Sequence, residues 1–458
     1  MRRSAALLIA ATLSLTAAAC SSSSSSNSTA AADSSGGGGK VTVSIDCAPP
    51  SSRPTQRQQW ADDIAGFEKL HPNVTVKSID TFPCETPELF TAALKGGTEA
   101  NVFYTYFTDK QQVLDAGRAA DITPYVTAGN LPVKDDILPS VWNSVRSGGK
   151  TYALPRTNYT MGMIINRRLF QQAGLNPDQP PQSWADVETD AKKIAALGNG
   201  IAGYGDYSAG NNGGWHFTAE MDAQGAAMVS PDGTKAAFDN AQGLAVLQNL
   251  HRLRFDDGVM GTTQLYKWGD LQKQMAAGKL GMYIAAPDDI TYLVQSLGAH
   301  YEDFGMGPIP GPNGPGAGSL AGGDDYMFNR KDTPAQITAG VQLVSYLWLT
   351  EGQGQSFDYA RSKASGQAVG LPEPQLFQGA TAAEDTRLKT ADATMPVQAF
   401  APFVSANVPG VTEPANAQAI YKILDTAMAS VLTDAKADPQ KLLDTASSQV
   451  DEILANAQ

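Results

Sequence analysis

The sequence is short of charged residues, of cysteine and of histidine. Only 17% of its 458 residues are Asp, Glu, Lys or Arg, and it has three cysteines and four histidines. With 46 acidic against 33 basic residues, the chain carries a formal net charge of −13, which repels phosphate backbones and argues against a general nucleic-acid role. The 42% of hydrophobic residues suffices for full cores, and the length predicts about two or three structural units. Glycine (44) and proline (27) are plentiful, which suits an extracytoplasmic protein with many ordered loops.

The sequence also lacks the motifs of the common enzyme classes. The scattered histidines form no HExxH motif and no Cys/His ligand spacing, so we expect neither a metal nor a cofactor. GxSxG and GxGxxG patterns are absent, and the stretch Gly149–Thr151 that looks like a phosphate-binding loop has Ser144 in place of its first glycine. The carboxylate pairs Asp288-Asp289 and Asp324-Asp325 leave a secreted glycan-active enzyme as an alternative, although polar ligand contacts or solvated turns are the favoured explanation of such pairs. We therefore expect a protein that is not an enzyme.

A targeting segment is predicted at the start of the chain. Arg2 and Arg3 precede an apolar run that is too short to cross a hydrocarbon core of ~30 Å, so residues 1–19 are expected to be a cleaved signal peptide. The small residues before Cys20 resemble a bacterial lipobox, although Ala17 stands where leucine is usual. Lipidation of Cys20 would anchor the protein to the outer face of the bacterial cell membrane through residues 20–40, a flexible Ser/Gly linker. Ordinary cleavage that leaves a free Cys20 is the alternative.

The next segment predicts a β-α-β unit. Residues 41–45 and 74–79 alternate as strands on either side of a helix, which makes the two strands parallel and adjacent. Cys47 and Cys84 follow the ends of these strands, so we expect them to form a disulfide; two buried thiols are the alternative.

Strands alternate with helices along the rest of the chain, which predicts α/β layers. Trp60 and Trp184 lie at helical spacing and are expected in the core. Residues 305–323 hold eight glycines and four prolines, which predicts a long loop. Further strands are expected at 101–104, 149–155, 161–165 and 280–284, and helices at 111–117, 183–197, 241–254, 265–277, 337–349, 420–431 and 442–454.

Several segments, in order along the chain, resemble one family. They are the helix-to-strand segment 60–74, the turn Ala119–Tyr125, the block Gly149–Pro155 with Ile165–Leu175, the Pro-Pro-Gln-Ser-Trp run Pro180–Trp184, the strand Ala277–Met282 and the late Gly370–Pro372. Their order and spacing are similar to those of the extracellular solute-binding proteins of ABC importers, specifically the sugar-binding branch that includes maltose-binding protein.

The resemblance implies an α/β, two-lobe periplasmic-binding-protein-like fold with discontinuous lobes joined by a hinge. By position, the N-terminal lobe should comprise 41–157 and 286–330 and the C-terminal lobe 158–285 and 331–458, with crossings near 155–160, 285–287 and 325–335. The implied function is that of a monomeric lipoprotein that captures a mono- or oligosaccharide by hinge closure and delivers it to the permease subunits of an ABC importer. A polyol, a glycerophosphodiester or a peptide is the alternative ligand.

A sugar site needs aromatic platforms for the C–H faces and planar polar groups for the hydroxyls. In open α/β sheets such groups come from loops at the carboxyl ends of strands. Tyr104 and Tyr106 could instead simply share one strand face, and Arg156 and Arg361 could pair with surface carboxylates. The candidates are Asp46, Glu85, Tyr104, Tyr106, Asp109, Arg156, Asn158, Tyr159, Trp215, Asp288, Asp289, Gly323, Asp324 and Arg361.

Overall fold

The predicted β-α-β unit is present in the computed structural model, which describes residues 39–51, 53–80, 87–374 and 376–456. β1 (Val41–Ile45) and β2 (Val74–Ser78) pair in parallel on either side of α1 (Pro54–Leu70). Trp60 on α1 is 4% exposed and lies in the core, as expected. Lys40–Gln458 form one compact unit. The predicted signal peptide, Cys20, Cys84 and Glu85 lie outside the described residues, so these predictions stay untested.

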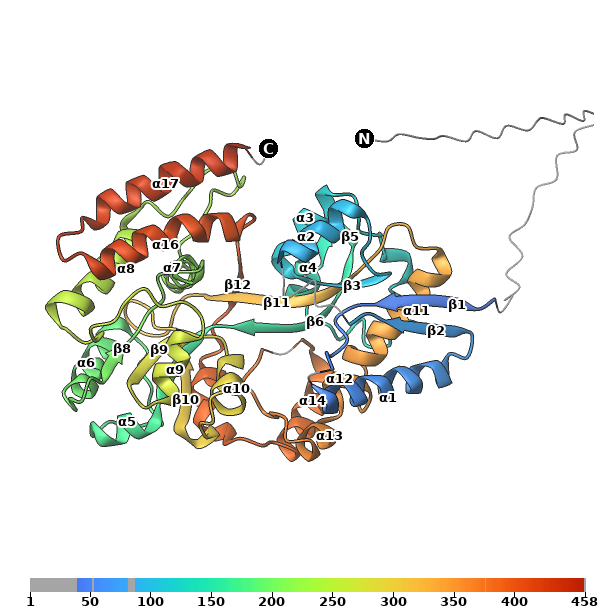
Figure 1. The fold of residues 1–458 in the computed structure, drawn as a ribbon, viewed down its shortest axis with the longest axis horizontal. Helices are drawn as coiled ribbons and strands as arrows, with labels where there is room; N and C mark the ends of the chain where they lie inside the picture. The colour runs from blue at the N-terminus through green and yellow to red at the C-terminus, as the bar shows by residue number, and fades with distance from the viewer. Residues whose placement is uncertain (1–38, 52, 81–86, 375, 457–458) are drawn as a thin grey trace, which may run out of the picture. The chain divides into compact units, whose positions relative to one another are not determined.

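The first sheet has six strands in the order β12-β11-β3-β1-β2, with β6 paired to β11 off this path (Figure 1). β11 (Ser319–Phe328) runs antiparallel to β3 (Val102–Tyr106) and to β6 (Ala153–Thr160), and parallel to β12 (Gly410–Thr412). The helices and the small hairpin of this part of the chain are α2 (Pro87–Gly96), α3 (Lys110–Asp115), α4 (Pro139–Ser144), β4 (Arg146–Ser147), β5 (Lys150–Thr151), α11 (Pro334–Val344), α12 (Gly354–Phe357), α13 (Tyr359–Ala364) and α14 (Gly379–Ala391).

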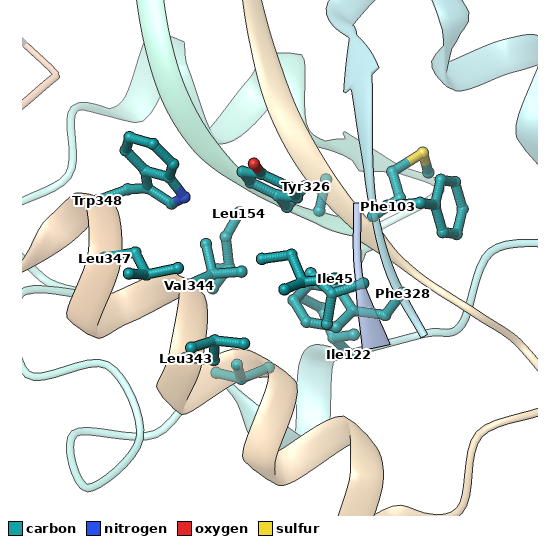
Figure 2. Packing of buried hydrophobic residues seen from close by; sticks show 14 of the residues in the cluster. Ile45, Phe103, Ile122, Leu154, Tyr326, Phe328, Leu343, Val344, Leu347 and Trp348 are labelled. Carbon is teal, nitrogen blue, oxygen red and sulfur yellow. The ribbon is translucent and has the colours of Figure 1, made fainter. Parts of the chain in front are cut away.

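Apolar side chains fill the space between this sheet and α11. Figure 2 shows Leu343, Val344 and Leu347 facing the strands, against Ile45 and Phe328. All five side chains are fully buried. Removing such large side chains from water is the main stabilising contribution to this half of the fold.

The second sheet has four strands in the order β10-β7-β9-β8. They are β7 (Gly162–Asn166), β8 (Ala202–Tyr204), β9 (Leu280–Ala285) and β10 (Phe304–Pro308). α6 (Trp184–Ala195) begins where predicted, because the Ser183 hydroxyl accepts a hydrogen bond from the Asp186 backbone N–H. The other helices are α5 (Arg167–Gln172), α7 (Asn212–Ala223), α8 (Ala241–His251), α9 (Asp270–Ala276), α10 (Asp288–Gln295), α15 (Ala401–Ala406), α16 (Ala417–Thr433) and α17 (Pro439–Asn456). None of the described helices combines the length and the apolar character that a membrane crossing requires.

The predicted long loop at residues 305–323 is shorter in the structure. β10 and the first half of β11 occupy its two ends, and residues 309–318 form the loop that connects them. The glycines of β11 serve close packing rather than a turn: a Cβ on Gly323 would lie 2.5 Å from the Thr157 carbonyl oxygen of β6 and 2.5 Å from the Phe107 ring. The glycines within β11 therefore reflect the close approach of β6 and of the Phe107 ring.

The strand pairing also differs from the expected lobe boundaries. Residues 304–308, expected in the N-terminal lobe, pair with β7 in the second sheet, and α11, expected in the C-terminal lobe, packs against β1 of the first sheet. The chain passes from the first sheet to the second at β6 and β7, near the expected residues 155–160. It returns along β11, later than the expected residues 285–287, and crosses again at β12, which the sequence patterns did not indicate.

Candidate functional site

Three neighbouring strands bring together a tyrosine, an arginine and an aspartate that the sequence singles out. Tyr104 lies on β3, Asp324 on β11 and Arg156 on β6. One carboxylate oxygen of Asp324, Oδ2, accepts hydrogen bonds from Tyr104 Oη at 2.8 Å and from Arg156 Nη1 at 2.5 Å. Asp324 is only 8% exposed, so the ion pair is largely removed from water.

Aromatic rings hold the arginine in place. The guanidinium carbon of Arg156 lies 4.8 Å from the centroid of the Trp348 ring and 5.4 Å from that of Tyr104. Trp348 in turn stacks on Tyr326 with centroids 6.0 Å apart and an interplanar angle of 17°. Figure 2 shows both rings beside the apolar side chains that pack between the first sheet and α11. Cation–π contacts of this kind pre-position a planar cation for bidentate hydrogen bonding.

The end of β3 carries two further candidates. Tyr106 is 41% exposed, and its ring meets the Tyr104 ring edge-on at 5.4 Å between centroids. Asp109 Oδ2 accepts the Tyr106 backbone N–H at 3.2 Å, and burial raises the pKa of Asp109 to about 6. Asp46 lies deeper: it is 4% exposed, Oδ1 accepts the Tyr104 backbone N–H at 2.9 Å, and burial raises its pKa to about 8. Asp46 thereby fixes the strand that presents the two tyrosines.

A cavity of about 540 Å³ lies along β6 and β11 of the first sheet, and part of its wall comes from residues 397–404, which pack against β10 of the second sheet. β6 contributes the candidates Asn158 and Tyr159. A second cavity of about 200 Å³ adjoins it and is lined by Arg156 and Trp348. The residues that line both cavities are Asn158, Gly370, Leu371, Glu373, Pro374 and Lys389. Together the two spaces form one cleft, which we call the central cleft.

Two carboxyl groups that line neither cavity, Glu413 and Asp288, act electrostatically on the cleft residue Tyr159. Glu413 follows β12, and its Oε1 accepts the Tyr421 hydroxyl at 2.6 Å. Burial raises the pKa of Glu413 to about 7, and the negative charge of Asp109 adds to the shift. Burial also raises the pKa of Asp222 to about 8, with a further contribution from the charge of Glu413. Asp288, a sequence candidate, is the exposed first residue of α10. Removal from water raises the pKa of Glu373, Lys389 opposes that shift, and the negative charge of Asp288 adds to it.

The remaining candidates lie elsewhere. Asp289 is 3% exposed and accepts hydrogen bonds from Trp268, Gln272 and Tyr283. Arg361 is paired with Asp63 at 2.8 Å. Trp215 lies on α7, partly buried beside His216, and lines neither cavity. Gly323 is the close-packing position described above. Whether any of these residues contacts a ligand stays a prediction.

Several residues that line the cleft were missed. They are Phe107 and Phe403 in short helical segments, Glu373 in a loop, Lys389 near the end of α14 and Thr412 at the end of β12. Only the Gly370–Pro372 resemblance pointed to this neighbourhood. Among the residues that the structure describes, no group of three or more His, Cys, Asp and Glu side chains is arranged to hold a metal ion.

Residues 51–353 match the family of bacterial extracellular solute-binding proteins. The chain belongs to this family. A putative binding protein from Brucella abortus (strain 2308) is 31% identical over 169 residues, which is 36% of the chain and 39% of that relative. The chain thus spans well under half the length of that relative. A 51-residue stretch is 37% identical to the sn-glycerol-3-phosphate-binding periplasmic protein UgpB of Yersinia enterocolitica, covering 11% of the chain and 12% of UgpB.

Solved structures share the fold of this solute-binding protein. The cyclic α-maltosyl-1,6-maltose binding protein of Arthrobacter globiformis superposes with a TM-score of 0.70 at 19% identity, covering 91% of the chain and all of that structure. UgpB from Mycobacterium tuberculosis in complex with glycerophosphocholine gives a TM-score of 0.69 at 20% identity, with 92% and 100% coverage. The predicted periplasmic-binding-protein fold is therefore confirmed, and the family to which the chain belongs is one of extracellular solute-binding proteins.

Proposed function

We propose that the solute is a carbohydrate, which enters the central cleft, draws the two sheets together by hinge closure and is then delivered to the permease subunits. The observation that supports this is the combination lining the cleft. Arg156 lines the cleft with a planar hydrogen-bonding group that Asp324 and the Tyr104 and Trp348 rings hold in place, and residues of the crossing strands β6 and β11 line it as well. The hydroxyls of a sugar would bind the planar hydrogen-bonding groups, and its C–H faces would pack on the aromatic rings. Closure follows when one ligand contacts groups from both sheets.

A calorimetric melting screen of the full chain tests this proposal. Mono- and oligosaccharides, polyols, glycerophosphodiesters, peptides and amino acids are added in turn. A ligand at about a hundred times its Kd adds about 2.7 kcal/mol, which raises Tm by about 3 °C for a chain of this length. A saturable shift with a sugar, lost in Asp324→Ala, is the expected result. A shift with a peptide or a polyol and with no sugar would remove the carbohydrate assignment.

A glycerophosphodiester is the second candidate. It is favoured by the resemblance of the fold to UgpB with glycerophosphocholine bound and by the short match to a glycerol-3-phosphate-binding relative. The structure gives this candidate little support, because the cations lining the central cleft, Arg156 and Lys389, are each already paired with a carboxylate.

We also propose that Cys20 carries a lipid and that Cys47 and Cys84 form a disulfide. Metabolic labelling of the producing cells with an alkyne fatty acid tests the first point. The label should appear on the wild-type chain and on Ala17→Leu, and disappear from Cys20→Ala. Equal labelling of the Cys20→Ala chain would refute the anchor.

A further inference from the structure

The two spaces of the central cleft differ in the chemistry of their linings. The smaller space, of about 200 Å³, is lined by four charged side chains, which are Arg156, Glu373, Asp385 and Lys389. Glu373 and Lys389 also line the larger space, of about 540 Å³. Among the described residues that line only the larger space, none is charged. The larger space therefore offers a ligand no charged group of its own.

The smaller space combines the groups that suit a sugar ring. Arg156 and Asn158 supply planar polar groups, and the Trp348 and Tyr359 rings line the same space. A guanidinium has five N–H donors, and the hydrogen bond from Arg156 to Asp324 leaves from Nη1, so further donors remain for the hydroxyls of a ligand. The aromatic rings provide faces on which sugar C–H groups pack.

The larger space has an apolar wall, which reaches from α4 to residues 397–408. Val404 on α15 is 61% exposed, although a valine side chain is stable when it is removed from water. A single exposed valine is ordinary, but a group of apolar side chains around one cavity is typical of a binding site. The members of this apolar wall are Leu138, Val141, Val397, Phe403, Val404 and Val408.

This apolar wall is a poor partner for a second sugar ring. Valine and leucine side chains have neither a hydrogen-bonding group nor an aromatic face. A ring with a hydroxyl on nearly every carbon would leave some hydroxyls unpaired against them, which is unfavourable. An alkyl or aryl group gains from the same contact, because its apolar surface leaves water. The Phe403 ring can pack on either partner, so the aliphatic members decide between them.

We propose that the ligand is a glycoside, in which a sugar that occupies the smaller space carries an apolar alkyl or aryl group that occupies the larger space. This inference rests on the proposed carbohydrate function and names its substrate class. The two spaces share several lining residues, among them Asn158 and Leu371, so one ligand can extend from one into the other. The volume of the larger space lies within the range of about 300–1,000 Å³ that encloses drug-sized ligands.

Isothermal titration of the full chain with matched glycosides tests the proposal. The probes are D-glucose, D-galactose and D-mannose, each as the free sugar and as its methyl, hexyl and phenyl glycosides. Maltose and cellobiose replace the apolar group by a second sugar, and hexanol supplies the apolar group alone. A buried methylene group contributes roughly fourfold in affinity. We therefore expect the hexyl or the phenyl glycoside of one sugar to bind at least about tenfold more tightly than its methyl glycoside, with a more negative heat-capacity change.

The outcomes separate this inference from the function on which it rests. A methyl glycoside or a disaccharide that binds as tightly as the hexyl and phenyl glycosides overturns the inference and leaves the carbohydrate function intact. Hexanol that binds as tightly as the hexyl glycosides, or the absence of binding by every sugar and glycoside, overturns the carbohydrate function as well. A preference between the hexyl and phenyl forms, with both above the methyl form, supports the inference and identifies the apolar group as alkyl or aryl.

Variants locate the apolar group in the larger space. In Val404→Asn the ratio of hexyl to methyl glycoside affinity should fall by about threefold or more, while the affinity for the methyl glycoside is unchanged. Leu70→Asn is the matched control: Leu70 ends α1, is 60% exposed and lines neither cavity, so the ratio should stay the same. Val397→Thr/Val404→Thr keeps the shape of the apolar wall and adds only hydroxyls. An unchanged ratio in both folded variants overturns the placement of the apolar group.

Discussion

Replacing Asp324 by alanine should destabilise the protein and remove ligand binding together. The substitution leaves the Arg156 guanidinium without its counter-ion and the Tyr104 hydroxyl without its acceptor. Breaking a buried ion pair costs about 3–5 kcal/mol, which we lower to about 2–4 kcal/mol because the Arg156 side chain is 27% exposed to water. With an unfolding entropy of roughly 2.1 cal/mol/K per residue, Tm should fall by about 2–5 °C.

Calorimetry and urea unfolding measure the effect, and a double-mutant cycle assigns it. Arg156→Met/Asp324→Leu removes both charges and should be less destabilised than the sum of the two single variants by about 1 kcal/mol or more. Asp178→Ala, which removes a carboxylate 68% exposed and paired with Arg167, is the control and should change the free energy of unfolding by less than about 1 kcal/mol. Equal losses in Asp324→Ala and Asp178→Ala, or strict additivity in the cycle, would refute the reasoning.

Three further changes test other parts of the fold. Gly323→Ala should destabilise the protein by about 1–3 kcal/mol, because its Cβ meets the Thr157 carbonyl at 2.5 Å, whereas Gly314→Ala, with nothing within 4 Å, should be nearly neutral in the same urea titration. Burial raises the pKa of Asp46 to about 8, above its unfolded value near 3.8, so the folded state holds a proton there that the unfolded state releases, and stability should fall as pH rises from about 4 to 8. Asp46→Asn should flatten that slope in melts recorded across this range; an unchanged slope contradicts the assignment. Cys47→Ser/Cys84→Ser should lower the free energy of unfolding by about 3–4 kcal/mol if the pair closes its loop, and no loss relative to the wild type would argue for two thiols.

Local patterns were sufficient for most elements. The alternation of residues 41–45 and 74–79 correctly predicted two parallel strands, and Ser183 before Trp184 correctly predicted the start of α6. The error at 305–323 arose because glycine and proline favour turns locally. Gly322 and Gly323 instead belong to β11, where a neighbouring strand and the Phe107 ring come close, a tertiary requirement that a single sequence does not display.

The candidate site was predictable only in part. Tyr104, Arg156 and Asp324 were named separately, and the pairing of β3, β11 and β6 makes them one cluster. Glu373, which lines the cleft, was not named, because it lies in an irregular segment with no local pattern. The predicted lobe boundaries differ from the structure for a related reason. Which sheet a strand joins depends on strands that are distant in the sequence.

The position of Trp348 gives the protein an optical property. Its indole lies between the Arg156 guanidinium and the Tyr326 ring and is only 7% exposed, so its ultraviolet emission depends on a cation 4.8 Å away. A solute that draws Arg156 toward itself would change the brightness and colour of that emission. The fold thus contains a label-free reporter at the cleft, from which a biosensor for the solute could be built without attaching a dye.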